Sequence, residues 1–240
     1  MASKALTKSL LSFYRFIRRR HKSHTHASHI KLHKYSCHDK LVTKTLVFDV
    51  EGGLLRSSSL FPYFMLVALE GGGLIRGFLL LLLYPLLCCL GEESAIRAMV
   101  LVSFCGLKKD KFRVGRSVLP KYLIEELGFE GFDTMRRGKK RVCVSRMPRV
   151  MVEGFLKEYL EVEVVAAREL KVVGGFYTGF MEEEKKALGL EELLGEEEGV
   201  DADAFGFGCY PKSLHPYLFS VCKDIYTADN ITLWIKMLDN

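Results

Sequence analysis

Residues 60–90 are the most apolar stretch of the chain, and they constrain most strongly how it can fold. The stretch is LFPYFMLVALEGGGLIRGFLLLLLYPLLCCL. Its charge-free part, residues 77–90, has only fourteen residues and contains Pro85, whereas a straight helix needs about 20 apolar residues to cross the bilayer. Glu70 and Arg76 interrupt any longer window. The sequence therefore predicts a pair of short helices, with the glycines at 71–73 as their turn.

The second of these helices has no polar face, because residues 79–83 are five consecutive leucines. A helix that is apolar all round must be enclosed by protein or by lipid. Two interpretations follow: the helical hairpin dips into one leaflet of a membrane, or it is buried inside a helical cap of the protein. We favour membrane association, because a chain of 240 residues leaves little protein to cover such a helix.

The N-terminal arm differs in kind from the rest of the chain. Residues 1–45 hold eleven Lys and Arg against one acid, so the net charge of +6 combines an arm of about +10 with a remainder of about −4. Residues 4–20 (KALTKSLLSFYRFIRRR) are typical of a basic amphipathic helix on a membrane surface, of an organelle transit peptide, or of a solvated terminus. Six of the seven histidines also lie in the arm, without the ligand spacing of a defined metal site. No RNA-binding motif accompanies these basic residues, so we expect no nucleic-acid partner. The amphipathic arm and the apolar stretch favour a membrane as the partner.

The composition is that of a globular protein, with 49% hydrophobic and 27% charged residues. It argues against a disordered tail, a fibre or a disulfide scaffold. The number of cysteines is odd and no C-x-x-C pair occurs, which predicts reduced, mostly buried thiols in a protein that faces the cytosol, and no structural zinc site. These cysteines are Cys37, Cys88, Cys89, Cys105, Cys143, Cys209 and Cys222.

Two acids follow directly after an apolar run near the start of the chain. Residues 45–53 are TLVFDVEGG, so Asp49 and Glu51 lie two residues apart at the end of a predicted buried strand. Open parallel sheets bind ligands at the carboxyl ends of their strands. The alternative is that both acids cap the N-terminus of a helix, where negative charge is favourable.

The later chain continues an alternation of strands and helices. Residues 139–145 (KKRVCVS) predict a second strand that ends in Ser145, and residues 149–160 predict an amphipathic helix. Residues 163–167 predict a third strand, and residues 171–180 a hairpin with Gly174 and Gly175 at its turn. Such alternation predicts a parallel sheet flanked by helices.

The segment Asp49-Val50-Glu51-Gly52-Gly53 resembles the first motif, D-x-D-G-T/V, of the haloacid dehalogenase superfamily of phosphatases. Ser145 resembles the hydroxyl residue that closes a strand in the second motif. The resemblance implies an α/β fold: a haloacid dehalogenase-like Rossmannoid parallel sheet with an inserted, very hydrophobic helical cap at about residues 56–138, as in the subgroup similar to phosphoserine phosphatase.

Longer segments resemble the N-terminal half of plant glycerol-3-phosphate acyltransferases that make cutin and suberin precursors. They are SSSLFPYFMLVALEGGG, RVCVSRMPRVMVEGFLKEYL and HPYLFSVCKDIY. The resemblance implies three parts: a basic His-rich arm (1–44), a haloacid dehalogenase-like domain (45–226) and a divergent tail (227–240). The family's acyltransferase domain carries H-x-x-x-x-D, and no histidine here has an Asp at that spacing. We therefore expect a truncated chain without acyltransferase chemistry.

The resemblance also implies a vestigial phosphatase site. Asp49 matches the nucleophile, Glu51 the acid/base position with one extra methylene, and Lys185, or its neighbour Lys186, the lysine of the third motif. Cys209 stands where the family's G-x-G-D motif has its metal-binding Asp, and a thiol is a poor ligand for Mg²⁺. We expect a catalytically silent domain without a cofactor, in which Asp49 and Glu51 would be the ligands if any Mg²⁺ bound.

The function that follows is anchoring or regulation, with an acyltransferase domain or a homologous chain as the protein partner. The family's lipid chemistry implies the endoplasmic reticulum membrane, and the acid-free N-terminus leaves the mitochondrion as an alternative. The alternative function is a Mg²⁺-dependent phosphatase acting on lysophosphatidic acid. In that case Asp49 would be the nucleophile, and Asp201 or Asp203 would complete the metal site.

Overall fold

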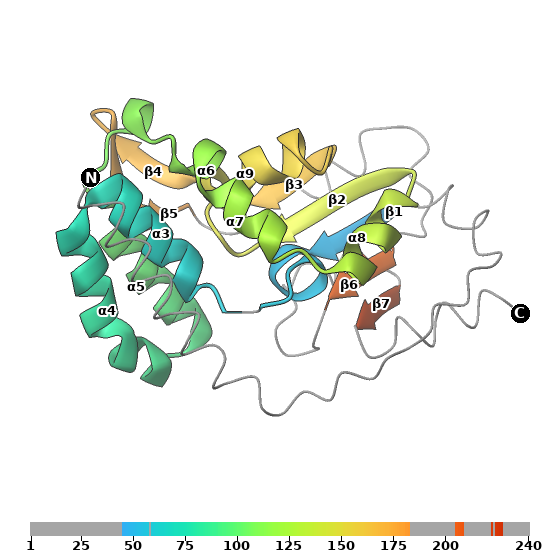
Figure 1. The fold of residues 1–240 in the computed structure, drawn as a ribbon, viewed down its shortest axis with the longest axis horizontal. Coiled ribbons are helices and arrows are strands. Elements are labelled where there is room, and N and C mark those ends of the chain that lie inside the picture. The colour runs from blue at the N-terminus through green and yellow to red at the C-terminus, as the bar shows by residue number, and fades with distance from the viewer. Residues whose placement is uncertain (1–44, 58, 183–204, 209–221, 223, 228–240) are drawn as a thin grey trace, which may run out of the picture.

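The structure, a computed structural model, describes residues 45–57, 59–182, 205–208, 222 and 224–227 (Figure 1). The strands are β1 (Thr45–Asp49), β2 (Lys140–Ser145), β3 (Val164–Ala167), β4 (Leu170–Val173), β5 (Phe176–Met181), β6 (Phe205–Gly208) and β7 (Asp224–Thr227). The helices are α3 (Phe61–Gly72), α4 (Leu74–Cys89), α5 (Glu92–Phe104), α6 (Val114–Ser117), α7 (Leu119–Glu125), α8 (Phe129–Arg136) and α9 (Arg149–Glu158), with a π-helical turn η1 (Val50–Leu54) and a 3-10 turn η2 (Lys109–Lys111).

The central feature is a five-stranded sheet of order β3-β2-β1-β6-β7, in which all neighbouring strands are parallel. β1 lies in the middle of the sheet. Its residues Leu46, Val47 and Phe48 are all buried, as expected of a strand covered on both faces. Phe48 stacks on Phe207 of β6, with ring centroids 4.7 Å apart. α9 connects β2 to β3, so the predicted strand, helix and strand after residue 139 are confirmed.

Helices α3, α4 and α5 form a group at one end of the molecule, and the antiparallel hairpin β4–β5 lies beside them (Figure 1). The hairpin is tied to the segment after α5 by two backbone hydrogen bonds: Gly106 N–H donates to the Tyr177 carbonyl at 2.8 Å, and Tyr177 N–H donates to the Leu107 carbonyl at 2.9 Å. The predicted hairpin is therefore confirmed, but it packs against the helical region rather than extending the sheet.

The glycine turn predicted between the two apolar helices is confirmed. Gly73 separates α3 from α4 with φ of 86°, a left-handed conformation that favours glycine. Gly77 lets the two helices approach closely, since a Cβ there would lie 2.2 Å from a methyl carbon of Leu69. The hairpin of helices is thus set by small residues in and just after the turn.

α4 is not enclosed by protein, which goes against the alternative that it is buried inside a helical cap. One face, which includes Gly77, Leu80 and Leu87, is buried. The opposite face is open: Ile75 is 85% exposed, Phe78 67% and Leu82 65%. Among the described helices none is long and apolar enough to cross a bilayer. The structure therefore leaves an apolar helix lying on the surface of the molecule.

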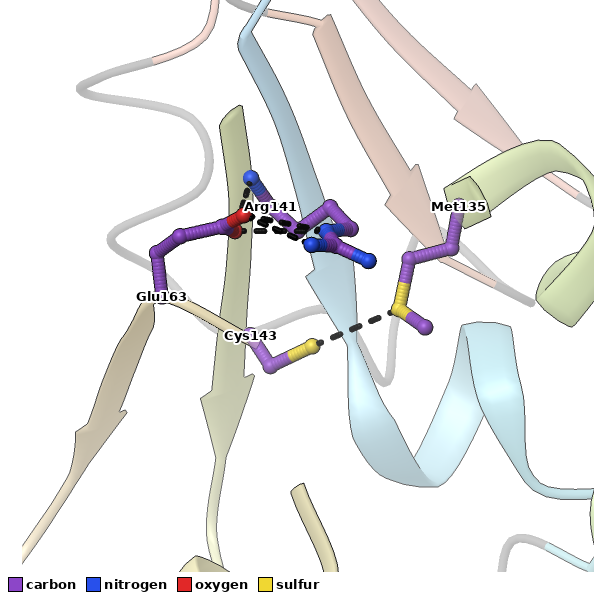
Figure 2. Close-up of polar contacts among 4 residues, drawn as sticks. All are labelled: Met135, Arg141, Cys143 and Glu163. Atoms are coloured by element: carbon purple, nitrogen blue, oxygen red, sulfur yellow. Dashed lines mark hydrogen bonds and ion pairs between the residues drawn. The ribbon is translucent and has the colours of Figure 1, made fainter. Parts of the chain in front are cut away.

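β2 is fixed to the start of β3 by the side chain of Arg141, which donates to the carboxylate of Glu163 at 2.8 Å and 3.1 Å (Figure 2). Two residues further along β2, the buried thiol of Cys143 lies 4.0 Å from the sulfur of Met135 (Figure 2). Burial raises the pKa of the Cys143 thiol well above its usual range, so this cysteine is an unreactive core residue.

The expectation of mostly buried thiols was wrong for the cysteines that the structure describes. Cys143 and Cys222 are buried, but Cys88, Cys89 and Cys105 are exposed. The adjacent pair at 88–89 ends α4, and it is exposed for the same reason as the apolar residues before it: the neighbouring helices cover only one face of α4.

Candidate functional site

The structure brings together Asp49, Glu51 and Ser145, three of the residues that the sequence singled out. Asp49 is the last residue of β1 and Ser145 the last residue of β2. The two strands are parallel neighbours, with Asp49 opposite Val144, so their carboxyl ends meet at one edge of the sheet. The turn η1 then carries Glu51 back over this edge. All three side chains are buried.

Glu51 is held by the segment that follows β2. One of its carboxylate oxygens, Oε1, accepts a hydrogen bond from the Ser145 hydroxyl at 2.5 Å and from the backbone N–H groups of Arg146 at 3.1 Å and Met147 at 3.2 Å. Hydrogen bonds to an ionised carboxylate are short and strong. Glu51 is thus committed to the β2–α9 connection and does not cap a helix of its own.

Asp49 has the opposite environment, because no hydrogen bond of normal geometry reaches either of its carboxylate oxygens. Burial is the main cause that raises the pKa of Asp49 well above its usual value, and the nearby Glu51 carboxylate raises it further. The guanidinium of Arg146 opposes these effects only in part. The carboxyl of Asp49 is therefore stabilised in its protonated form.

Within the described part of the chain, no third metal-binding side chain joins Asp49 and Glu51. Mg²⁺ requires near-octahedral oxygen ligands and usually one or two ionised carboxylates. Asp49 favours its neutral form, and Glu51 presents Oε1 to three donors. Among residues 45–57, 59–182, 205–208, 222 and 224–227, no three His, Cys, Asp or Glu side chains are grouped to hold a metal. The expectation that the chain needs no cofactor stays a prediction.

Several sequence-predicted site residues cannot be placed. Lys185, Lys186, Asp201, Asp203 and Cys209 lie outside the described residues, so their predicted roles stay predictions. Two hollows of the described structure also lie elsewhere. One, of about 240 Å³, is lined by α5 and β5, and the other, of about 400 Å³, by the end of α3 and the segment 106–118. Neither is lined by Asp49, Glu51 or Ser145.

Two arginines, one after β2 and one after β3, link the sheet to α5, and sequence reasoning missed both. Arg146, directly after β2, contacts Glu92 at 2.5 Å. Arg168, directly after β3, donates to both oxygens of Glu93 at 2.6 Å and 3.1 Å. Glu92 and Glu93 form the first turn of α5. These partners are far apart in sequence, 75 residues for Arg168 and Glu93, so no local pattern could have revealed them.

The η1 turn is packed so tightly that only glycine fits at position 53. This is where the resembled motif has Thr or Val. A Cβ at Gly53 would lie 2.9 Å from the carbonyl oxygen of Phe207 on β6, and the Gly53 carbonyl lies 2.2 Å from the position of a Cβ on Gly131. The turn that carries Glu51 is therefore clamped between β6 and α8.

Gly53→Ala is expected to lower the free energy of unfolding by about 1–3 kcal/mol, the scale of overpacking in a well-filled interior. Urea unfolding of the whole chain, followed by circular dichroism, measures this change. Gly91→Ala is the control, because nothing lies within 4 Å of a Cβ at Gly91 and its φ of −60° is ordinary. Equal stability of the two variants would contradict the tight packing of the turn.

Comparison with known proteins agrees with this fold. Residues 45–228 match the family described as "Glycerol-3-phosphate acyltransferase RAM2-like, HAD-like domain". The chain is 48% identical over 217 residues to the probable glycerol-3-phosphate acyltransferase 3 of Arabidopsis thaliana, and 46% identical over 202 residues to the probable glycerol-3-phosphate acyltransferase 2 of the same plant. These matches cover 89% and 83% of this chain but only 42% and 38% of the relatives. The chain thus spans about two fifths of the length of the curated relatives it matches.

A solved structure with a similar fold is a protein of unknown function from Bordetella pertussis Tohama I. The TM-score is 0.61 at 15% sequence identity, and the match covers 82% of this chain and 96% of that one. At this identity the likeness shows the fold alone. It supports a parallel α/β sheet joined to a helical region.

Proposed function

The chain belongs to the RAM2-like family of haloacid dehalogenase-like domains of plant glycerol-3-phosphate acyltransferases, and we propose that it is a catalytically silent membrane-attachment domain. The observation that carries the proposal is the open apolar face of α4. Ile75, Phe78, Leu82 and Leu86 are exposed and follow one another at spacings of three and four residues, so they line one side of the helix. An exposed apolar patch of this kind marks an interaction site.

A membrane surface fits this face better than a span does. α4 has 16 residues, which makes it about 24 Å long, less than the roughly 30 Å of the hydrocarbon core. Such a helix can lie in the plane of the interface with its apolar side in the acyl region. Arg76, the charged residue in its first turn, is directed away from this side, because its guanidinium donates to the Ser103 carbonyl on α5 at 3.4 Å.

Basic residues lie beside the start of the same helix. Lys108, Lys111 and Arg113 line the hollow that also includes Gly71 at the end of α3, and all three are exposed. A cluster of exposed bases next to an apolar helix is complementary to anionic lipid headgroups, where each base contributes about 1 kcal/mol. We therefore propose that the α3–α4 turn and α4 together contact an anionic leaflet.

Two features support the absence of phosphatase chemistry. A phosphoryl-accepting carboxylate must be ionised, whereas burial favours the neutral form of Asp49. A metal that would neutralise the phosphoryl oxygens has no ligand set among the described residues. We propose that the domain anchors or regulates an acyltransferase domain, in the same chain or in a homologous one, for glycerolipid, cutin or suberin synthesis at the endoplasmic reticulum, with the mitochondrion as the alternative location.

The proposal is tested by flotation with lipid vesicles that contain phosphatidylserine. We expect the natural chain to float with the vesicles, and Phe78→Glu/Leu82→Glu to reduce the bound fraction at least about tenfold, because two charges would enter the acyl region. Phe129→Glu is the matched control: Phe129 is 65% exposed but lies on α8, so this variant should float like the natural chain.

Three results would contradict the proposal. One is equal flotation of the α4 double variant and the natural chain. Another is equal loss of binding in Phe129→Glu, which would indicate non-specific adhesion of apolar residues. The third concerns the silent site: Mg²⁺-dependent phosphate release from p-nitrophenyl phosphate or lysophosphatidic acid that is lost in Asp49→Asn would show a working phosphatase.

A further inference from the structure

The connection between β2 and α9 presents three hydrogen-bond donors to a single point. They are the hydroxyl of Ser145 and the backbone N–H groups of Arg146 and Met147, and the atom at that point is Oε1 of Glu51. Successive backbone N–H groups that converge in this way form a nest that binds anions. The same serine hydroxyl accepts from Met147 N–H at 3.1 Å, which holds the three donors in one arrangement.

The group that fills this nest comes from another part of the chain. Glu51 lies 94 residues before Ser145, and its side chain reaches the nest from the π-helical turn η1. Its second oxygen, Oε2, is buried and has no hydrogen-bond partner of its own. The hydrogen bonds of normal geometry that hold this carboxylate are therefore all made to Oε1.

The side chains around the nest are also suited to a bound oxyanion. The Arg146 guanidinium is almost buried and acts electrostatically on both Glu51 and Asp49. Asp49 is 1% exposed and lies beside Glu51 with both oxygens unpartnered. A tetrahedral oxyanion bears several acceptor oxygens, and a protonated carboxyl can donate to one of them while the nest donates to another.

We infer that Glu51 is an internal ligand that occupies an oxyanion-binding nest, so the chain keeps closed a site that would otherwise bind phosphate. This inference rests on the proposed silence of the site and gives it a physical cause: the chain's own carboxylate occupies the oxyanion-binding nest.

The test compares three forms of the full chain in inorganic phosphate and in sodium chloride of equal ionic strength. In Glu51→Ala the nest is vacant, and 50 mM phosphate is expected to raise the unfolding temperature by at least about 3 °C over chloride. The natural chain and Glu51→Gln should show no such difference, because the glutamine oxygen accepts the same three hydrogen bonds without the charge. Adding Ser145→Ala to Glu51→Ala should remove the phosphate response.

The outcomes are distinct. A folded Glu51→Ala chain that does not respond to phosphate overturns the inference, and so does an equal response in the natural chain or in Glu51→Gln. If Glu51→Ala does not fold, Glu51→Asn takes its place, since its uncharged side chain is one methylene shorter and cannot reach the nest. Broadening of the phosphate ³¹P resonance by the responding variant alone confirms direct binding. Phosphate release by the natural chain would instead contradict the proposed function, so the two failures are distinguishable.

Discussion

Replacing Glu93 with alanine is expected to lower the free energy of unfolding by about 2–3 kcal/mol. The side chain of Arg168 is only 5% exposed. Its guanidinium donates two hydrogen bonds to the carboxylate of Glu93. Removal of one partner from a buried pair leaves an uncompensated charge, which typically destabilises a protein by about 3–5 kcal/mol. We expect the lower figure because Glu93 itself is 47% exposed and is partly screened by solvent.

The control for this prediction is Glu153→Ala. Glu153 also pairs with two bases, Arg149 at 3.1 Å and Lys157 at 3.0 Å, but all of these side chains are at least one-third exposed. Its loss should therefore change the free energy of unfolding by less than about 1 kcal/mol. Urea unfolding of both variants measures the contrast, and equal effects would show that the Arg168 pair contributes no more than a surface pair.

The contribution of Glu93 to the free energy of unfolding should also depend on pH. Burial alone would raise the pKa of Glu93, but the guanidiniums of Arg168 and Arg97 hold it below its ordinary value. A lowered pKa in the folded chain stabilises it at pH values above the ordinary pKa of about 4.5, and the contribution is lost as the pH falls through the folded value. The difference between the natural chain and Glu93→Ala should therefore shrink below about pH 4.

Asp49→Asn is expected to stabilise the chain at neutral pH, by about 1–3 kcal/mol on the scale of a buried, unpartnered polar group. Since the pKa of Asp49 is raised by burial and by Glu51, the folded chain binds a proton that the unfolded chain releases. Stability then falls as the pH rises from the ordinary value of about 3.8 through the raised value. Asparagine has no proton to lose, and its amide can donate to the Glu51 carboxylate beside it.

The advantage of Asp49→Asn should therefore grow between about pH 4 and pH 8 and be absent at the acidic end. Thermal unfolding across this range measures it. Asp133→Asn is the control, because Asp133 is partly exposed and pairs with Arg137 one helical turn away, so its replacement should be neutral or slightly destabilising. A lower stability of Asp49→Asn at neutral pH would show that Asp49 is ionised in the folded chain and is held by a cation.

Local patterns were enough to predict β1, β2 and β3 of the five-stranded sheet, the helix after Pro148 and the two glycine turns, but β6 and β7 were not predicted. The run Leu46-Val47-Phe48 predicted a buried parallel strand because such a strand is apolar on both faces. Asp49 and Ser145 were each predicted to end a strand, and they meet because the structure pairs β1 and β2 in parallel, which brings their carboxyl ends to one edge. The family was recognised from the same residues and from the longer segments around them.

The direction of the Glu51 side chain could not be predicted in this way. The motif alone suggested an acid/base group that points to a substrate. In the structure, the Glu51 carboxylate instead accepts hydrogen bonds from Ser145, Arg146 and Met147. That choice depends on the π-helical turn at 50–54 and on the tight contact of Gly53 with β6. The contacts of this turn with Ser145 and with Phe207 join segments that lie more than ninety residues apart in the sequence.

Hydrophobic periodicity and glycine positions act over a few residues, so they were sufficient to predict a parallel α/β sheet and an apolar helical hairpin. The family was predicted from motifs and longer matching segments. Only the tertiary structure decided which face of α4 stays open, that Arg168 reaches Glu93 on α5, and that Glu51 fills a nest at the end of β2. These are contacts between distant residues, and their outcome depends on how the helical region packs on the sheet, which no local pattern specifies.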